Sequence, residues 1–523
     1  MKKKLTVVLL LFVSYNSFAT RYYVNEVANG NNNGLSWANA YTNLQSAVSS
    51  AIFGDEIWVA TGTYKASTVN NRDISFVMKN GVNLYGSFSG TETLLSQRDI
   101  IANPTNLSGD IGALGDNSDN TKKIIKIQNI SSSIIIDGFR IVSGYDGSSS
   151  GEGAGAYVYS NSGGNITFKN CLFYNNYSYY QGGAVSTKNS NIVFDKCQFL
   201  YNSSFNYGGG AIYSANVSNC NLYIRSSKFI GNSSRSGAVI NFDGFVLKID
   251  KSIITNNTAT TGSIIQVSDA NDFTISNSLL AGNLIQSNYG ASVISSYSVP
   301  ANSSNLVNVT VCHNRNNSQL TISDEAIYKA NSAMNIYNSI VYGNTRSDSN
   351  AQIDPGNNVV NSIVENGYIG TNNLNVDPLF VNPIDLTAAP FDVTNFDYSL
   401  QNNSLGINSG NNTFVSNYPF DYLENTRIQE TTVDRGAIES SYSLSTNTFS
   451  DKTINHFFDN GTNHLHFIDL EKFLNQEVAI YNTSGKLVFK NKIEKNEMEI
   501  NLTQGIYLVH IKDYKTLKIV VVQ

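Results

Sequence analysis

The chain has 523 residues and a formal net charge of −6, and only 14% of its residues are charged. A nucleic-acid-binding protein needs a basic stripe, so this charge balance argues against a nucleic-acid partner. Glycine and tyrosine are abundant, with 39 and 30 copies. Together with many Asn and Ser residues, this composition favours β-structure with many turns and a polar, weakly charged surface.

The first 19 residues have the pattern of a secretory signal peptide. Three lysines at positions 2–4 are followed by an apolar run at 5–13, which is shorter than the roughly 20 residues that span a bilayer as a helix. Ser17-Phe18-Ala19 fits the small-x-small cleavage pattern and predicts a mature chain from Thr20. We expect an exported protein without a transmembrane segment.

Residues 20–60 predict a strand, a helix and a second strand. The apolar residues of Leu44–Ile52 lie on one helical stripe, between strands expected at Arg21–Val24 and Glu56–Ala60. The open end of a stack of strands would expose apolar surface and unpaired edges. We therefore expect this helix to form an N-terminal cap on the first coil of such a stack.

Three aspartates, Asp110, Asp116 and Asp119, lie close together in the stretch SGDIGALGDNSDN. The carboxylates and carbonyls of such a loop can bind Ca²⁺. Their spacing does not match an EF-hand, and Asp, Asn and Gly are also typical of turns without a metal. Calcium is the one cofactor that the sequence suggests, and both interpretations of the loop stay open.

The middle of the chain repeats one short unit, seen clearly in Ile192–Asn202 (IVFDKCQFLYN). Its inward residues are expected at positions 192, 194, 197 and 199, on two period-2 strands joined by a bend. The closing Asn can bond its own backbone, adopt a left-handed conformation, or bond the Asn of the next coil in a ladder. Copies of the unit end at Asn176, Asn232, Asn257, Asn283, Asn314 and Asn344, and two end copies have Gly144 and Gly367 in place of Asn.

Constant strands separated by variable loops predict an all-β fold, namely a parallel β-helix or solenoid over residues 20–440. Cys171 and Cys197 hold the same inward slot in successive coils, where later coils have Ser. Coils about 4.8 Å apart allow a disulfide between them. The alternative is that each cysteine is simply a small buried side chain.

The repeat ends near residue 375. We expect the last coils and a C-terminal cap between Val376 and residue 440, closing with DRGAIE at Asp434–Glu439. Residues 441–452 are a polar linker. In residues 453–523, strands are expected at Val478–Asn482, Lys486–Phe489, Glu499–Leu502, Gly505–Ile511 and Leu517–Val522, which suit a small β-sandwich.

These motifs carry a family resemblance over residues 21–440. The opening YYVNEVANGNNNGLSWANAYTNLQSAVSSAIFGDEIWVATGTYK, with the later GVNLYGSF, QRDI, TNLSGDIG and IDGFRIVSG, resembles secreted right-handed parallel β-helix proteins of the Bacteroidetes with a pectin-lyase-like fold. The GGA and FxxN pairs resemble the repeats of polymorphic outer-membrane proteins, and DPLF and DRGAIE resemble the tail that follows such helices. The resemblance implies the fold and leaves the activity open.

The C-terminal residues are similar to the type A sorting domain of the type IX secretion system. The matching motifs are YN at 481–482, GKLV at 485–488, GIYLV at 505–509 and KIVVVQ at 518–523. The resemblance implies that Gly485, Gly505, Tyr507 and Lys518 belong to a sorting signal. It also implies that the type IX machinery is a partner and that the protein is secreted or displayed at the outer-membrane surface.

Two groups of residues outside the inward slots are candidates for binding. Asp195, Lys196 and Arg225 fall at the bend between the two strands of neighbouring coils and would form a stripe of mixed charge; charged residues are also expected on any solvated bend. The second group is aromatic and belongs to the loops that follow two coils; its members are Tyr177, Tyr179, Tyr180 and Tyr207. Exposed tyrosines stack on sugar rings or on a partner protein, whereas packed ones cover the coils.

The first functional hypothesis is therefore a non-enzymatic, adhesin-like or glycan-binding rod, whose partner is a polysaccharide or a host or cell-surface glycan. The alternative is a polysaccharide lyase or glycoside hydrolase on the same fold. Hydrolysis needs clustered acids, and elimination needs Ca²⁺ with a basic residue. Because no two carboxylates have a defined catalytic spacing, no catalytic residue is predicted.

Overall fold

The computed structural model describes residues 19–215, 220–286, 292–300, 302–317, 325–345, 352–386, 395–440, 456–467, 474–483, 485–511 and 517–521. The chain forms two compact units, residues 1–441 and 442–523. Most of the predicted signal peptide (residues 1–18) and the predicted linker (residues 441–452) lie outside the described residues.

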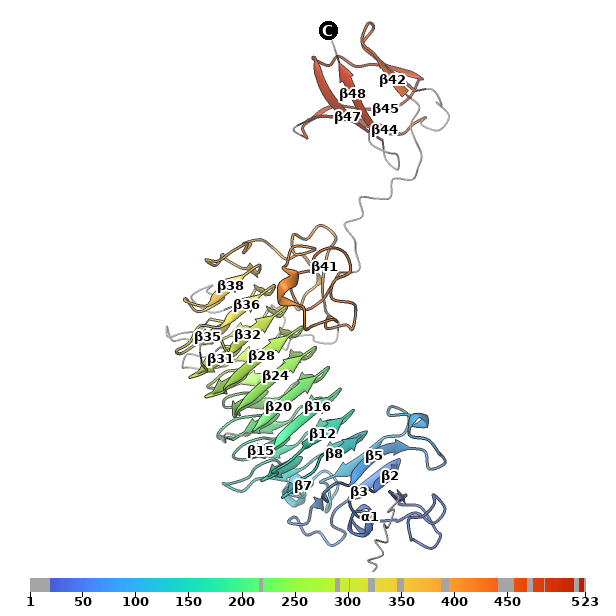
Figure 1. Cartoon of the computed structure of the whole chain (residues 1–523), viewed down its shortest axis with the longest axis vertical. Helices are drawn as coiled ribbons and strands as arrows, with labels where there is room; N and C mark the ends of the chain where they lie inside the picture. The colour runs from blue at the N-terminus through green and yellow to red at the C-terminus, as the bar shows by residue number, and fades with distance from the viewer. Residues whose placement is uncertain are drawn as a thin grey trace, which may run out of the picture. The chain divides into compact units, whose positions relative to one another are not determined.

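The larger unit is a stack of coils whose strands form long parallel sheets, which confirms the predicted parallel β-helix (Figure 1). Sheet A consists of β1 (Arg21–Val24), β2 (Glu56–Ala60), β5 (Asn83–Phe88), β8 (Ile134–Asp137), β12 (Asn165–Lys169), β16 (Asn191–Asp195), β20 (Asn221–Arg225), β24 (Val246–Asp250), β28 (Asp272–Ser276), β32 (Ser304–Val307), β36 (Asn335–Tyr337) and β38 (Asn358–Val360). Sheet B consists of β3 (Gly62–Lys65), β6 (Thr105–Ser108), β9 (Phe139–Val142), β13 (Leu172–Tyr174), β17 (Gln198–Leu200), β21 (Lys228–Ile230), β25 (Ile253–Thr255), β29 (Leu279–Ala281), β33 (Thr310–Cys312), β37 (Ile340–Tyr342) and β39 (Ile363–Val364).

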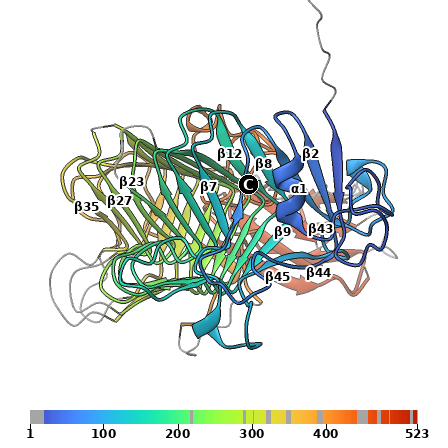
Figure 2. The ribbon, with the colours of Figure 1, turned by 90° about the horizontal axis from the view of Figure 1, so that it is seen from below.

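Two further parallel sheets contribute strands to most of the coils, and Figure 2 shows the strands of successive coils one behind another. Sheet C consists of β4 (Phe76–Val77), β7 (Ile125–Gln128), β11 (Ala156–Tyr159), β15 (Val185–Lys188), β19 (Ile212–Ser214), β23 (Ile240–Asp243), β27 (Ile265–Ser268), β31 (Ile294–Tyr297) and β35 (Ile327–Lys329). Sheet D consists of β10 (Tyr145–Asp146), β14 (Tyr177–Ser178), β18 (Ser203–Ser204), β22 (Ser233–Ser234), β26 (Thr258–Ala259), β30 (Leu284–Ile285) and β34 (Arg315–Asn316).

The N-terminal helix α1 (Leu44–Ser50) is present where the sequence predicts it. The Asn43 side chain caps it by accepting a hydrogen bond from the Ser46 amide. Leu44, Ala47 and Val48 are buried in the same core cluster as the first strands. Short 3-10 turns occur at Leu95–Gln97, Asn117–Asp119 and Asn412–Phe414.

The repeat unit folds as two strands joined by one left-handed residue. In the central copy β16 ends at Asp195, Lys196 has φ 55°, and β17 begins at Gln198. The next inward slot holds Cys197, whose amide donates to the Ser227 hydroxyl of the following coil at 3.1 Å. All four cysteines are free, so the cysteines are small buried side chains and not a disulfide.

The predicted asparagine ladder is present and buried. The Asn176 side-chain amide donates to the Asn202 oxygen at 2.9 Å, and Asn202 donates in the same way to Asn232 at 3.0 Å. The chain of bonds continues through Asn257, Asn283 and Asn314 to Asn344. The ladder residues themselves do not adopt the left-handed conformation, which belongs to the residue before each one, such as Tyr201 with φ 55°. The role of these asparagines is therefore to satisfy buried polar groups from coil to coil.

The segment 375–440 differs from the expected last coils and cap. Its strands β40 (Phe380–Asn382) and β41 (Asp397–Leu400) pair with each other, and its apolar side chains cover the outer side of sheet B. The covered side chains of the stack include Ile253, Leu279, Cys312 and Ile340. These outward positions are apolar because the segment removes them from water.

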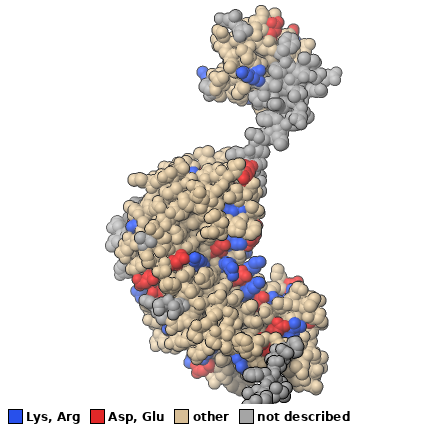
Figure 3. Space-filling view, viewed as in Figure 1, with Lys and Arg blue, Asp and Glu red and all other residues tan. Residues whose placement is uncertain are grey.

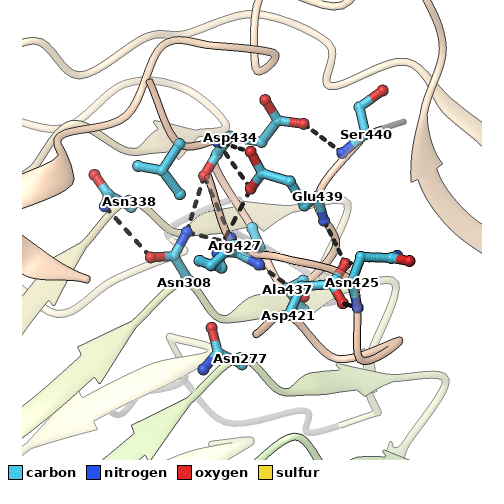
Figure 4. A network of polar contacts seen from close by, with 12 residues as sticks. Asn277, Asn308, Asn338, Asp421, Asn425, Arg427, Asp434, Ala437, Glu439 and Ser440 are labelled. Carbon is cyan, nitrogen blue, oxygen red and sulfur yellow. Dashed lines mark hydrogen bonds and ion pairs between the residues drawn. The ribbon is translucent and has the colours of Figure 1, made fainter. Parts of the chain in front are cut away.

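A buried polar cluster, consisting of Asp421, Arg427, Asp434 and Glu439, fastens this segment to the stack (Figure 4). Arg427 is 1% exposed and donates to the backbone carbonyl of Ala437 at 3.1 Å, and its Nε lies 3.6 Å from Glu439 Oε2. From the stack, Asn308 Nδ2 donates to the Asp434 carbonyl at 2.8 Å. The DRGAIE motif is thus a structural joint between the segment and the coils.

Protonation of this cluster should make stability depend on pH. Burial, reinforced by the neighbouring Asp434 carboxylate, raises the pKa of Glu439 to about 8 from an ordinary 4.5. A raised folded-state pKa favours the protonated form, so its contribution is complete below pH 4.5 and is lost as pH rises through 8. Urea unfolding should show a stability that falls by up to about 1.4 kcal/mol per pH unit within this window.

The variant Glu439→Gln should lose most of this pH dependence and keep the smaller part that comes from Asp434, whose pKa is raised by burial. Glu430 is exposed on the same segment, so Glu430→Gln is the matched control and should keep the wild-type slope. An identical slope in wild type and Glu439→Gln would contradict the assignment.

The smaller unit has two antiparallel sheets that share one core, which confirms the predicted β-sandwich. One sheet holds β42 (His456–Asp459), β43 (His464–Phe467) and β46 (Glu497–Glu499); the other holds β45 (Leu487–Lys492), β44 (Glu477–Asn482), β47 (Gly505–Ile511) and β48 (Leu517–Val521).

Candidate functional site

The charged residues Asp195, Lys196 and Arg225 lie at the bend between sheets A and B. Parallel register places Asp195 beside Arg225 and Arg225 beside Asp250, at the ends of β16, β20 and β24. Lys196 follows Asp195 as the left-handed bend residue and is exposed, as is Arg225. The three predicted residues therefore share one corner of the stack.

Further basic side chains lie at the same corner. Lys169 ends β12 in register with Asp195, and Arg140 and Lys228 lie on one outward row of sheet B. We call the set Arg140, Lys169, Lys196, Arg225 and Lys228 the basic patch. Figure 3 shows basic and acidic side chains interspersed over the middle of the stack.

Acids lie close to the patch, because Asp195 and Asp250 flank Arg225 in the register and Glu424 interacts electrostatically with Lys196. Over the described parts of the chain, none of the five forms an ion pair within 4.0 Å. The neighbouring lysines differ, because Lys251 lies 2.8 Å from Glu424 and Lys248 lies 2.9 Å from Asp272. The patch therefore ends where Glu424 of the C-terminal segment reaches the bend.

The predicted tyrosines pack against rings of adjacent coils. Tyr177 stacks on Tyr145 with ring centroids 4.8 Å apart, and Tyr180 stacks on Tyr207 at 5.4 Å. Tyr179 makes a tilted contact with Phe205 at 5.4 Å. Each of these rings contacts a ring of an adjacent coil, so the group is a packed ladder of aromatic side chains.

The structure does not bring the tyrosines together with the charged bend. The bend joins sheets A and B, whereas these tyrosines belong to β14 and to the loops between sheets D and C. Tyr207 is the most exposed of the four predicted tyrosines, at 51%, and it lines a hollow of about 320 Å³ beside sheet C. The other side chains of this hollow were not predicted from the sequence.

The loop with Asp110, Asp116 and Asp119 does not gather its carboxylates. Each accepts a hydrogen bond from a backbone amide of its own loop, from Gly115, Ser118 and Ala113 respectively. In the described residues, no group of three or more His, Cys, Asp or Glu side chains is arranged to hold a metal ion. These aspartates act as turn formers in this structure, and it gives the calcium expectation no support.

The predicted sorting residues lie on the larger sheet of the smaller unit. Gly485 has φ 78° in the turn between β44 and β45, a conformation that favours glycine. Gly505 begins β47, where Tyr507 is 6% exposed and donates from its hydroxyl to the Thr503 carbonyl at 2.9 Å. Lys518 lies exposed on β48.

Comparison with known proteins identifies this unit. Residues 459–523 match the family described as secretion system C-terminal sorting domain. The chain carries a type IX sorting domain. This domain directs export by the type IX secretion system to the cell surface or beyond, and its machinery is therefore a partner of the chain. In the described residues, no helix is long and apolar enough to cross a membrane.

Two solved structures are similar to this chain at low sequence identity. The pectate lyase Pel9A is 15% identical and covers 81% of this chain and 97% of its own, with a TM-score of 0.40. PfbA, a surface adhesin of Streptococcus pneumoniae, is 13% identical and covers 64% of this chain and 77% of its own, with a TM-score of 0.23. No curated protein matches the sequence.

Proposed function

We propose that the protein is an exported β-helix that binds an acidic polysaccharide through the basic patch, as an adhesin-like surface or secreted rod. The observation that carries this proposal is the set of five basic side chains, free of ion pairs in the described residues, on a chain with net charge −6. Isolated surface charges contribute little, but several aligned charges act together on a polyanion.

The geometry of the patch suits a regular polymer. Coils repeat about every 4.8 Å along the stack, so Lys169 and Arg225, which lie two coils apart in one row, present positive charge about 9.6 Å apart, and Lys196 lies beside this row in the coil between them. Asp195 lies within this row and is aligned with Arg225. A polymer with carboxylate or sulfate groups and intervening hydroxyls supplies both the anions and the donors that this mixture needs.

The test is a double charge reversal, Lys196→Glu with Arg225→Glu. Binding to polygalacturonate, alginate and chondroitin sulfate is measured by calorimetry at low salt and at about 0.5 M NaCl, where screening shortens the range of charge interactions. We expect at least one polymer to bind the wild type, an affinity that falls at high salt, and a loss of about tenfold or more in the variant.

Lys126→Glu is the control, because Lys126 lies on sheet C in register with Tyr157, away from the bend. It should bind like the wild type. Equal affinity of the double variant and the wild type would contradict the proposal. Depolymerisation of any of the three polymers would replace it with a polysaccharide lyase or hydrolase.

A further inference from the structure

A second surface, distinct from the basic patch, lies on the outer face of sheet C. The hollow of about 320 Å³ contains outward side chains of three neighbouring strands, Tyr213 of β19, Asn241 of β23 and Gln266 of β27. Parallel register aligns these three residues in one row. Tyr207 and Arg235 from the preceding loops form its rim.

One acid in the hollow has an unsatisfied oxygen. Asp243 Oδ1 is buried and has no hydrogen-bond partner in the described part of the chain. Burial, with a smaller contribution from Asp269, raises the pKa of the Asp243 carboxyl. Asp243 also lines the hollow, so its carboxyl group can accept a hydrogen bond from a ligand bound there.

Donors and acceptors both point to the same space. The Arg235 Nε donates a hydrogen bond to the Thr261 hydroxyl at 3.2 Å, and the Gln266 side-chain oxygen accepts a hydrogen bond from the Ser236 hydroxyl. The remaining guanidinium nitrogens and the Gln266 amide nitrogen are donors, while Asp243 is an acceptor. A hydroxyl group of a ligand can bond to a donor and to an acceptor of the hollow at once, because it donates one hydrogen bond and accepts others.

We propose that this hollow is a binding site for one neutral, hydroxyl-rich sugar unit, which stacks beside Tyr207 and bonds to Arg235, Asp243 and Gln266. Its volume lies at the lower end of the 300–1,000 Å³ that is typical of ligand sites, which suits a single ring. The aromatic rim provides the apolar contact that a sugar face requires.

Asp243 and Arg235 carry opposite charges, so the hollow attracts neither anions nor cations overall, which suits a neutral ligand. The basic patch at the bend between sheets A and B differs, since it favours anions. The two surfaces are therefore expected to bind different ligands independently, and the hollow does not depend on the function proposed for the patch.

The test uses the full chain and the methyl glycosides of glucose, galactose, mannose and N-acetylglucosamine. Binding is detected by saturation-transfer NMR and quantified by calorimetry. We expect at least one glycoside to bind, and Asp243→Asn and Tyr207→Ala each to weaken it by about tenfold or more. The double variant Lys196→Glu with Arg225→Glu should bind it unchanged.

Two variants control for general effects on this face. Asp269→Asn removes an exposed neighbouring acid that does not line the hollow, and Tyr328→Ala removes an aromatic ring further along the same row of sheet C. Both should bind like the wild type. The proposal is overturned if no glycoside binds, or if binding survives Asp243→Asn and Tyr207→Ala. Loss of binding in the charge-reversed patch variant would also overturn it.

Discussion

Above pH 8, where Glu439 is ionised, Arg427→Met is expected to lower the free energy of unfolding of the β-helix unit by about 3–5 kcal/mol, because it leaves a buried carboxylate without its cation. Arg427 is 1% exposed, and Glu439 and Asp434 are 3% and 1% exposed. Methionine retains most of the side-chain length, so the loss reports charge and hydrogen bonding more than volume. The carbonyls of Ala437 and Gly436 also lose their donor.

Urea unfolding of the full chain, followed by far-UV circular dichroism, measures this loss. Arg225→Met is the matched control, since Arg225 is exposed and its removal should change stability by no more than about 0.5 kcal/mol. A loss below about 1 kcal/mol for Arg427→Met would mean that the cluster does not hold the segment. Replacing the whole cluster by apolar residues is a different experiment, because it also removes the acids.

The coils could be predicted from the sequence because their signal is local. Alternating apolar residues such as Phe194 and Phe199 specify which way each strand faces, and one Asn per coil marks the turn. Identical side chains of successive coils then stack on one another and fix the register between the coils, as the hydrogen bond from Asn176 to Asn202 shows. The helix α1 was predictable for the same reason, since its stripe and its Asn43 cap are both within ten residues.

The path of residues 375–440 could not be predicted, because it depends on contacts with residues far away in the sequence, such as the bond of Asn308 to Asp434. One signal was available and not used. Outward positions of sheet B are polar at Gln198 and Lys228 but apolar at Ile253 and Leu279, which indicates that something covers the later coils.

The candidate sites also differ in how far their residues could be predicted from the local sequence. The alignment of Asp195 with Arg225 follows from the repeat unit alone, whereas Arg140 and Lys228 join the patch only through the outward row of sheet B. The hollow was missed because sheet C has no fixed distance from the Asn marker. Its signal was a Gly-Ala or Gly-Ser pair shortly before several strands of sheet C, such as Gly210-Ala211 before β19, after which outward residues such as Asn241 alternate.

Phe199→Asp is expected to unfold several coils, because it places a charge in the most regular part of the core. Phe199 is 0% exposed and stacks between Phe173 and Phe229, with centroids 4.9 Å and 4.7 Å away. Loss of the ring alone should cost about 3–5 kcal/mol. The buried carboxylate has no partner and adds a further cost, so the expected loss exceeds that of Phe199→Ala.

Gln198→Asp is the matched control, because it introduces the same charge into β17 at the preceding residue, which is exposed on the outer side. It therefore shows whether the effect of Phe199→Asp comes from burial of the charge. Thermal melting should change little for Gln198→Asp and should lose its main transition for Phe199→Asp. In a stack of repeats each coil contacts only the adjacent coils, so unfolding of one coil destabilises its nearest neighbours most. Hydrogen exchange should therefore show the loss of protection centred on β13, β17 and β21 and weaker toward both ends. An unchanged melting curve for Phe199→Asp would exclude an inward Phe199 and the stacking order built on it.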